Sequence, residues 1–146
     1  MTLPRILPAA ALFLALSPMV VQAADDPVVG TWWNEKKTAQ ITIEPCADSV
    51  CGKISWMNAP NRDDGTPKRD VNNQDEALQN RPILGMQIIG GFEKQEPGKW
   101  EDGEIYNPED GKTYDSNLAI NKDGTLAVEG CVLFFCQEQT WAPVTQ

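Results

Sequence analysis

Histidine is absent from this chain of 146 residues. Its absence excludes histidine-dependent catalytic triads, imidazole metal ligands and the usual general base near neutral pH. Basic residues are also few, because 12 lysines and arginines stand against 21 aspartates and glutamates, for a formal net charge of −9. A surface of this sign is a poor match for the phosphates of nucleic acids. We therefore expect no nucleic acid partner.

Long apolar runs are missing too, apart from a short one near the N-terminus. This run, residues 9–16, follows the cation Arg5 and precedes a small-residue stretch that ends in Ala23. The layout predicts a secretory signal peptide over residues 1–23, cleaved after Ala23. A bilayer span needs about 20 apolar residues, so we do not expect the chain to span a membrane. The remaining residues, 24–146, fit a single exported domain, either periplasmic or secreted.

Cysteine is sparse but regularly spaced, as the pairs Cys46/Cys51 and Cys131/Cys136. In an exported chain these residues are expected to be oxidised to disulfides, which also removes thiol nucleophiles. A four-thiolate zinc site is the alternative, although such sites usually use Cys-x2-Cys knuckles. Sequence alone permits three connectivities, and strand pairing is needed to choose among them.

The residues around Cys46 and Cys51 predict a β-hairpin if the two cysteines lie directly opposite each other. One face then carries a cross-strand ion pair and the other carries large apolar groups. The predicted pairs are Glu44–Lys53 and Thr42–Ser55 outside, and Ile43–Ile54 and Ile41–Trp56 inside. This register favours a local Cys46–Cys51 disulfide.

The same test applied to Cys131 and Cys136 predicts a second hairpin with a local disulfide. Its inner and outer faces again separate by polarity, apart from one pair of like charges. The predicted pairs are Leu126–Trp141 and Val128–Gln139 inside, Ala127–Thr140 outside, and Glu129 opposite Glu138.

Alternation of apolar and polar residues dominates the chain and predicts an all-β fold. Eight strands are expected, and the turn Lys122-Asp123-Gly124 sets Ile120 opposite Leu126. Closing the strands into an antiparallel up-and-down barrel removes exposed sheet edges, with a two-sheet sandwich as the alternative. The expected strands are Val28–Trp33, Ala39–Pro45, Gly52–Met57, Ile83–Phe92, Lys99–Tyr106, Thr113–Ile120, Thr125–Val132 and Gln137–Pro143.

One connection is long, the polar stretch Asn58–Asn80, and loops of this length in small domains are commonly functional or disordered. Within it, residues 70–75 alternate oxygen ligands but lack the glycine and terminal glutamate of a calcium loop. The acidic residues 101–104 read as a solvated strand face and not as a glycosidase pair. We therefore expect no metal, no cofactor and no enzymatic activity.

Aromatic residues and one arginine form the candidate ligand site. An eight-stranded barrel either fills its interior with side chains or holds one small ligand. Arg81 is interpreted either as a cap over aromatic rings at the barrel end or as an anchor for an anionic head group. The candidate ligand-binding residues are Trp32, Trp56, Asn80, Arg81, Tyr106, Tyr114 and Trp141.

Several short motifs occur along the chain at positions that are informative in combination. They are Gly30-x-Trp32, Cys51-Gly-Lys-Ile-x-Trp56, Asn80-Arg-Pro-Ile-Leu-Gly85, Ile105-Tyr-Asn-Pro-Glu-Asp-Gly-Lys-Thr-Tyr114, Gly130-Cys131 and Gln139-Thr-Trp141. Taken together, these motifs resemble an exported bacterial family known as domain of unknown function 2147. The resemblance implies a lipocalin-like or calycin-like barrel, and Gly30-Thr31-Trp32 is similar to the lipocalin Gly-x-Trp signature.

The chain departs from the family pattern at Trp141-Ala142-Pro143, where members tend to read Trp-x-Arg. Lipocalin-like barrels often pack a late arginine across the first-strand tryptophan, so this departure puts that packing in doubt. Arg81 is the candidate substitute.

Two functions compete at this point. The first is a non-enzymatic binder of a small apolar or amphipathic molecule inside the barrel. The alternative is a protein-interaction or envelope-stress module with a filled barrel, which would meet a periplasmic protein partner through the 58–80 loop.

Overall fold

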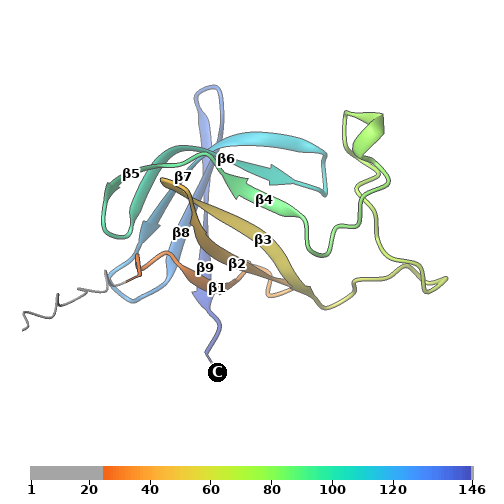
Figure 1. Ribbon diagram of the computed structural model, residues 1–146, viewed down its shortest axis with the longest axis horizontal. Helices are drawn as coiled ribbons and strands as arrows, with labels where there is room; N and C mark the ends of the chain where they lie inside the picture. Colours follow the sequence, from red (N-terminus) through yellow and green to blue (C-terminus); the bar gives the residue numbers. More distant parts are fainter. Residues whose placement is uncertain (1–24, 146) are drawn as a thin grey trace, which may run out of the picture.

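The computed structural model describes residues 25–145, so the predicted signal peptide lies outside the described residues. Nine strands and a single turn of 3-10 helix, η1, make up the regular structure (Figure 1). Their bounds are β1 Gly30–Trp33, β2 Ala39–Cys46, β3 Ser49–Met57, η1 Glu76–Leu78, β4 Gln87–Gly90, β5 Glu93–Glu96, β6 Lys99–Asn107, β7 Lys112–Ile120, β8 Leu126–Val132 and β9 Phe135–Pro143.

The strands form an antiparallel sheet in the order β4-β3-β2-β1-β9-β8-β7-β6-β5, and an additional β4–β6 pairing closes it. Eight strands therefore make a closed barrel, while β5 pairs with β6 alone. The predicted eight-stranded barrel is confirmed. Every pairing in the sheet is antiparallel.

The fourth predicted strand, residues 83–92, is wrong in extent. Residues 83–86 form a turn, in which Gly85 has a φ of 87°, and the strand splits into β4 and β5 at Gly91, with a φ of 76°. The break turns Phe92 onto Gly103 of β6, where an added Cβ would lie 2.3 Å from the Phe92 ring. Phe92 is thereby buried in the core, and β5 becomes an extra strand beside β6.

Both disulfides join the predicted partners, Cys46–Cys51 and Cys131–Cys136. The β8–β9 register is also confirmed, including Glu129 opposite Glu138, and so is Ile120 opposite Leu126. Each predicted hairpin disulfide is therefore local.

The register predicted for β2 and β3 is wrong by two residues. A two-residue turn pairs Cys46 with Ser49, so the Cys46–Cys51 disulfide links diagonal neighbours with a Cα–Cα distance of 5.8 Å. A shift of two preserves the inward face, which keeps Ile41 and Ile54 in the core. A bulge between Gln40 and Ile41 then turns Trp56 outward, where it is 41% exposed.

One end of the barrel is sealed by the segment that precedes β1. The Asp26 carboxylate accepts hydrogen bonds from Trp100 Nε1 at 3.1 Å and from the Gly98 amide at 3.2 Å, and it pairs with Lys94 Nζ at 2.9 Å. Burial would raise the pKa of Asp26, but the hydrogen bonds from Lys94 and Trp100 outweigh it and lower that pKa. Val28, two residues further on, is fully buried in the core.

The opposite end carries the β1–β2, β3–β4, β6–β7 and β8–β9 connections, including the 58–80 loop. In Figure 1 this loop, drawn in yellow and green, extends to the right of the barrel and returns to β4. It closes back on the barrel through the β6–β7 turn, where Asn72 Nδ2 donates to the carbonyl oxygens of Pro108 at 3.3 Å and Glu109 at 3.0 Å.

Candidate functional site: a cavity at the open end of the barrel

A cavity of about 870 Å³ occupies the open end. Its wall is largely aliphatic and aromatic, and most of these side chains come from the strands of the barrel. The volume lies in the range of small-molecule sites, which are about 300 to 1,000 Å³. The apolar lining comes from Ile41, Ile54, Met57, Ile83, Ile88, Ile105, Tyr106, Tyr114, Val128 and Trp141.

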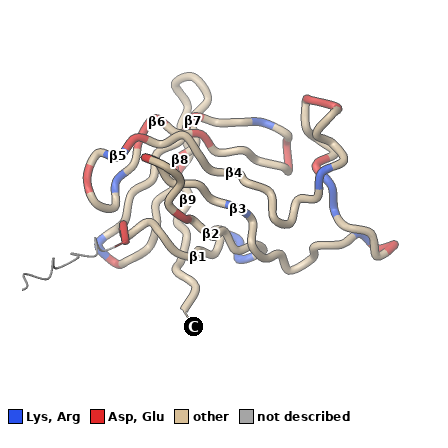
Figure 2. The backbone as a smooth tube through the Cα atoms, in the orientation of Figure 1, with Lys and Arg blue, Asp and Glu red and all other residues tan. Residues whose placement is uncertain are grey.

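The rim of the cavity is polar and carries more basic than acidic side chains. Within residues 25–145, three of its cations, Arg62, Lys68 and Arg69, have no carboxylate partner within 4.0 Å, whereas Lys36 pairs with Glu109 at 3.8 Å. Figure 2 shows basic segments in the long loop between β3 and β4. The lining thus holds four cations and three carboxylates, in a chain of net charge −9.

A buried carboxylate holds the long loop onto the barrel. Asp70 is 0% exposed and accepts hydrogen bonds from the Tyr106 hydroxyl at 2.6 Å and from Asn73 Nδ2 at 2.8 Å. It also accepts from Arg81 Nε at 2.9 Å, and Arg81 lies over the Tyr106 ring, 5.3 Å from its centroid. We call Asp70, Asn73, Arg81 and Tyr106 the loop latch. It joins both limbs of the loop to β6.

Electrostatics fix the protonation states within the loop latch. Burial would raise the pKa of Asp70, but hydrogen bonds from Tyr106, Asn73 and Arg81 outweigh it and lower that pKa. Burial and the hydrogen bond to Asp70 raise the pKa of Tyr106. Asp70 therefore stays ionised and Tyr106 stays protonated near neutral pH, so each is held in one protonation state as a structural contact.

The predicted ligand-binding residues separate into three groups. Tyr106, Tyr114 and Trp141 line the cavity. Asn80 and Arg81 lie in the loop, and Arg81 serves as the cap over an aromatic ring that one interpretation predicted.

The two remaining candidates, Trp32 and Trp56, lie away from the cavity. Trp32 is buried, and its Nε1 donates to the Val28 carbonyl at 2.9 Å. Trp56 lies on the outer surface, edge-on to Trp33 with ring centroids 5.4 Å apart. Arg81 packs on Tyr106, so the idea that it replaces the late arginine of lipocalin-like barrels beside Trp32 is wrong.

Sequence reasoning missed two features of this end. The first is the latch carboxylate, Asp70, whose only signal in the sequence is its place in the polar run 70–75. In the structure this run turns back on itself, and the Asn73 Oδ1 accepts a hydrogen bond from the Asp75 amide at 2.8 Å. The second is the apolar tip, which we define as Val132–Phe135, at the turn of the β8–β9 hairpin. Its trace was plain, because four consecutive apolar residues separate Cys131 from Cys136.

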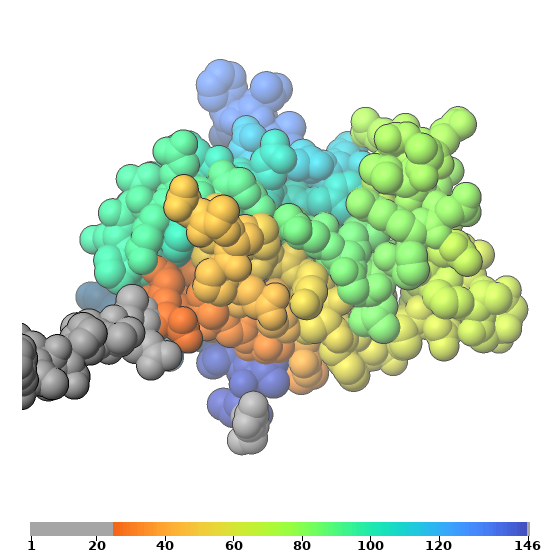
Figure 3. Space-filling view, in the orientation of Figure 1, coloured from red at the N-terminus to blue at the C-terminus, as the bar shows by residue number. Residues whose placement is uncertain are grey.

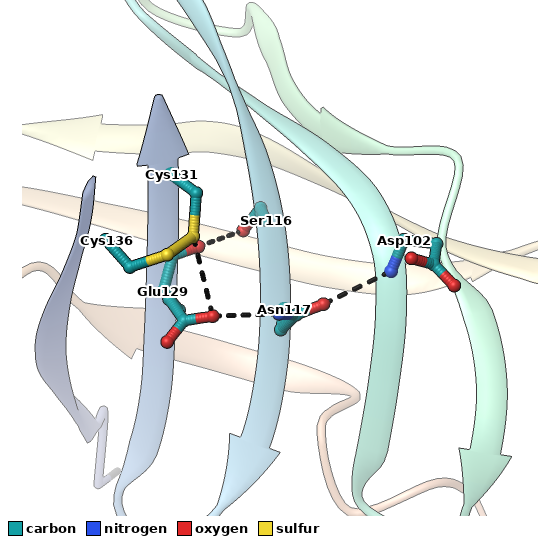
Figure 4. Close-up of a disulfide and its surroundings, with 6 residues drawn as sticks. All are labelled: Asp102, Ser116, Asn117, Glu129, Cys131 and Cys136. Atoms are coloured by element: carbon teal, nitrogen blue, oxygen red, sulfur yellow. Dashed lines mark hydrogen bonds between the residues drawn. A yellow bond between two sulfur atoms is a disulfide. The ribbon is translucent and has the colours of Figure 1, made fainter. Parts of the chain in front are cut away.

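One group of potential metal ligands lies below the apolar tip, namely Glu129, Cys131 and Cys136. Figure 4 shows both sulfur atoms joined in the disulfide, so neither is a thiolate that could bind a metal. The Glu129 carboxylate instead accepts a hydrogen bond from Asn117 Nδ2 at 2.8 Å, and the Glu129 carbonyl accepts one from Ser116 Oγ at 2.6 Å. This cluster braces the base of the hairpin.

Within the described part of the chain, no helix is long and apolar enough to cross a membrane.

Comparisons with known proteins agree with the barrel. A comparison with the curated proteins finds no match. Among solved structures, the chain is similar to protein HP1028 from Helicobacter pylori, described as belonging to the lipocalin family, with 20% sequence identity and a TM-score of 0.70. The match covers 81% of this chain and 83% of that one. The family model of an uncharacterised protein conserved in bacteria, DUF2147, matches residues 30–142. The chain therefore belongs to the DUF2147 family and has a lipocalin-like fold.

Proposed function

We propose that this protein is a non-enzymatic, exported binding protein that holds one small amphipathic molecule in the barrel cavity. The observation that carries the proposal is the cavity itself, which is open at one end and apolar in its depth. Its volume of about 870 Å³ fits a single small ligand. Two disulfides agree with an oxidising compartment, either the periplasm or the outside of the cell.

The polarity of the cavity indicates how the ligand is oriented. Its apolar part would contact the deep residues such as Ile41, Val128 and Trp141, where burial is favourable by about 25 cal/mol per Å². Its polar end would lie at the rim, beside Lys68 and Arg69. Because these cations have no carboxylate partner within 4.0 Å among the described residues, a negatively charged head group is favoured over a neutral one.

The alternative function, a protein-interaction or envelope-stress module, required a barrel filled with side chains. The cavity argues against a filled barrel. An interaction role for the 58–80 loop also has less support, because the loop latch and the contacts of Asn72 with the β6–β7 turn hold the loop against the barrel. We therefore keep ligand binding as the proposed function.

Filling the cavity tests the proposal. Gly130 lines it, and a Cβ added there would meet Tyr114 and Ile105 at ordinary distances of 3.7 and 3.8 Å. The Cβ of Gly130→Leu is therefore accommodated, and the rest of the leucine side chain should extend into the cavity. Thr140→Leu, on the exposed outer face of β9, is the matched control.

Two fluorescent probes report the binding, the anion 1-anilinonaphthalene-8-sulfonate and the neutral N-phenyl-1-naphthylamine. We expect Gly130→Leu to weaken the binding of both at least tenfold and Thr140→Leu to leave it unchanged. The double variant Lys68→Gln/Arg69→Gln should weaken the binding of the anionic probe and leave the binding of the neutral probe unchanged. Equal probe binding by Gly130→Leu and the wild type would contradict a cavity site, and equal losses of both probes in the double variant would contradict the anionic head group.

A further inference from the structure

The apolar tip is the most exposed group of large apolar side chains in the described chain. The exposed fractions are 49% for Val132, 84% for Leu133, 96% for Phe134 and 83% for Phe135. Exposed apolar residues that are scattered singly are ordinary, but a contiguous group marks an interaction site. Figure 3 shows the β8–β9 hairpin as a knob that projects from the body of the molecule.

The tip is held in shape by its own hairpin. Val132 pairs with Phe135 across a two-residue turn, and the Cys131–Cys136 disulfide lies one residue pair below. The bonds from Ser116 and Asn117 to Glu129 then tie the hairpin base to β7 (Figure 4). Since the side chains are presented on a preformed turn, little conformational entropy is lost when the tip docks.

We propose that the apolar tip inserts into the interfacial layer of a phospholipid bilayer. The tip is convex and carries no side chain that can form a hydrogen bond, whereas protein-binding hot spots are enriched in tryptophan, tyrosine and arginine. The Val132–Phe135 pairing satisfies backbone groups up to the turn, which an apolar layer requires.

The carboxylates of the β8–β9 hairpin and of β7 limit the depth of insertion. Glu138 is three residues beyond Phe135 and lies opposite Glu129, so at about 3.4 Å per residue this pair begins about 10 Å behind the tip. Asp115 of β7 is nearer, because it lies opposite Cys131, one residue below Val132. Interfacial segments insert about 5 to 10 Å, so insertion at the shallow end of this range places the tip in the layer and leaves the three carboxylates at the head groups.

The same carboxylates determine which lipids suit the tip. Glu129 and Glu138 would face the lipid head groups, and the chain as a whole has a net charge of −9. An anionic surface repels both, so zwitterionic lipid is the favoured target. A second copy of the chain fits poorly, because contact between two tips engages four residues on each side, whereas stable interfaces use about 20 to 30.

Docking would bring the cavity close to the bilayer. Gly130 and Gln137, at the base of the hairpin, line the cavity, so the tip projects from the rim of the mouth. A molecule could then pass between lipid and barrel beside the hairpin. This passage rests on the proposed function, whereas docking of the tip does not.

Vesicle flotation with the mature protein, residues 24–146, tests the proposal. We expect the wild type to float with phosphatidylcholine vesicles and the double variant Phe134→Ser/Phe135→Ser to lose at least tenfold in bound fraction. Val71→Ser, at another exposed apolar residue with 53% exposure, is the matched control and should float as the wild type does. Adding phosphatidylglycerol to the vesicles should lower binding.

Three outcomes would overturn the proposal. They are a wild type that fails to float, a double variant that floats equally well, and a tip-dependent dimer in sedimentation without lipid. Because both phenylalanines are more than 80% exposed, their replacement should leave the fold intact, and an unchanged thermal melting profile checks this. A failure of the flotation test would not affect the probe-binding test of the cavity, because Gly130→Leu alters no residue of the tip.

Discussion

Replacing Asp70 by Asn removes one charge from the loop latch while keeping the shape of the side chain. The wild-type carboxylate accepts from the Tyr106 hydroxyl on one oxygen and from Asn73 and Arg81 on the other. An asparagine can keep its oxygen toward Asn73 and Arg81, with its amide facing the Tyr106 hydroxyl. The main loss is therefore the charge that compensates Arg81 and strengthens each bond.

The magnitude follows from the burial of the two partners. Removing one member of a buried ion pair costs about 3 to 5 kcal/mol. Asp70 is fully buried, but the Arg81 side chain is 36% exposed and can recover part of its hydration, so the lower figure applies. We expect the loop to become less stable by about 3 kcal/mol, which corresponds to a roughly 150-fold larger opening constant.

Amide hydrogen exchange measures this opening at single residues. The reporters are the amides of residue 70 and Ile83, which donate to the carbonyls of Arg81 at 3.1 Å and Lys68 at 3.0 Å. Both should exchange about 150-fold faster in Asp70→Asn, while amides of the β7–β8 pairing keep their rates. The control is Asp63→Asn, an exposed residue in the same loop. Acceleration below tenfold at both reporters, or equal acceleration throughout β7 and β8, would refute the local latch.

Two further predictions concern the same loop. The pKa of Asp70 is lowered in the fold from an ordinary value of 3.8, so its stabilising contribution is complete above that value and is lost as pH falls through the lower folded pKa. An NMR titration should therefore show the Asn73 side-chain amide unchanged down to about pH 4 and shifting below it; a shift between pH 6 and 5 would contradict this sign. Gly111→Ala should release the loop, because φ is 71° and an added Cβ would lie 1.8 Å from the Asn72 carbonyl oxygen. In urea unfolding, Gly111→Ala should lower the free energy of unfolding by more than Gly124→Ala does, because Gly124 has a φ of 83° but open space around an added Cβ. Equal losses of about 1 to 2 kcal/mol in the two variants would show that backbone strain alone is responsible.

Local pairing rules gave the disulfides and the β8–β9 register because both depend on residues close in sequence. The closed barrel was inferred from the number of strands and the need to remove sheet edges, although its closure joins the distant residues Trp32 and Pro143. Cys131 and Cys136 do lie directly opposite each other, and the alternation around them has no interruption. The β2–β3 register differed because a two-residue turn keeps the same inward face as the predicted four-residue turn, and because nothing local in the sequence marks the bulge. Trp56 shows the consequence, since one extra residue was enough to move it to the outside.

The candidate site was less predictable because its parts meet only in the folded chain. Asp70 and Tyr106 are 36 residues apart in sequence, and nothing near Asp70 separates a buried carboxylate from a hydrated one. The basic rim was likewise hidden, because Lys68 and Arg69 are unremarkable as members of a polar loop. Their meaning comes from the cavity that the strands place beside them.

The shortness of β4 has a consequence for how the barrel exchanges its contents. β4 joins β3 through two residue pairs and β6 through two, whereas β6 joins β7 through seven. Segments with few paired residues open at the lowest free-energy cost. Among the eight strands of the closed barrel, β4 is therefore the one that we expect to detach first. A molecule held in the barrel would then have a lateral exit between β3 and β6 in addition to the open mouth of the cavity.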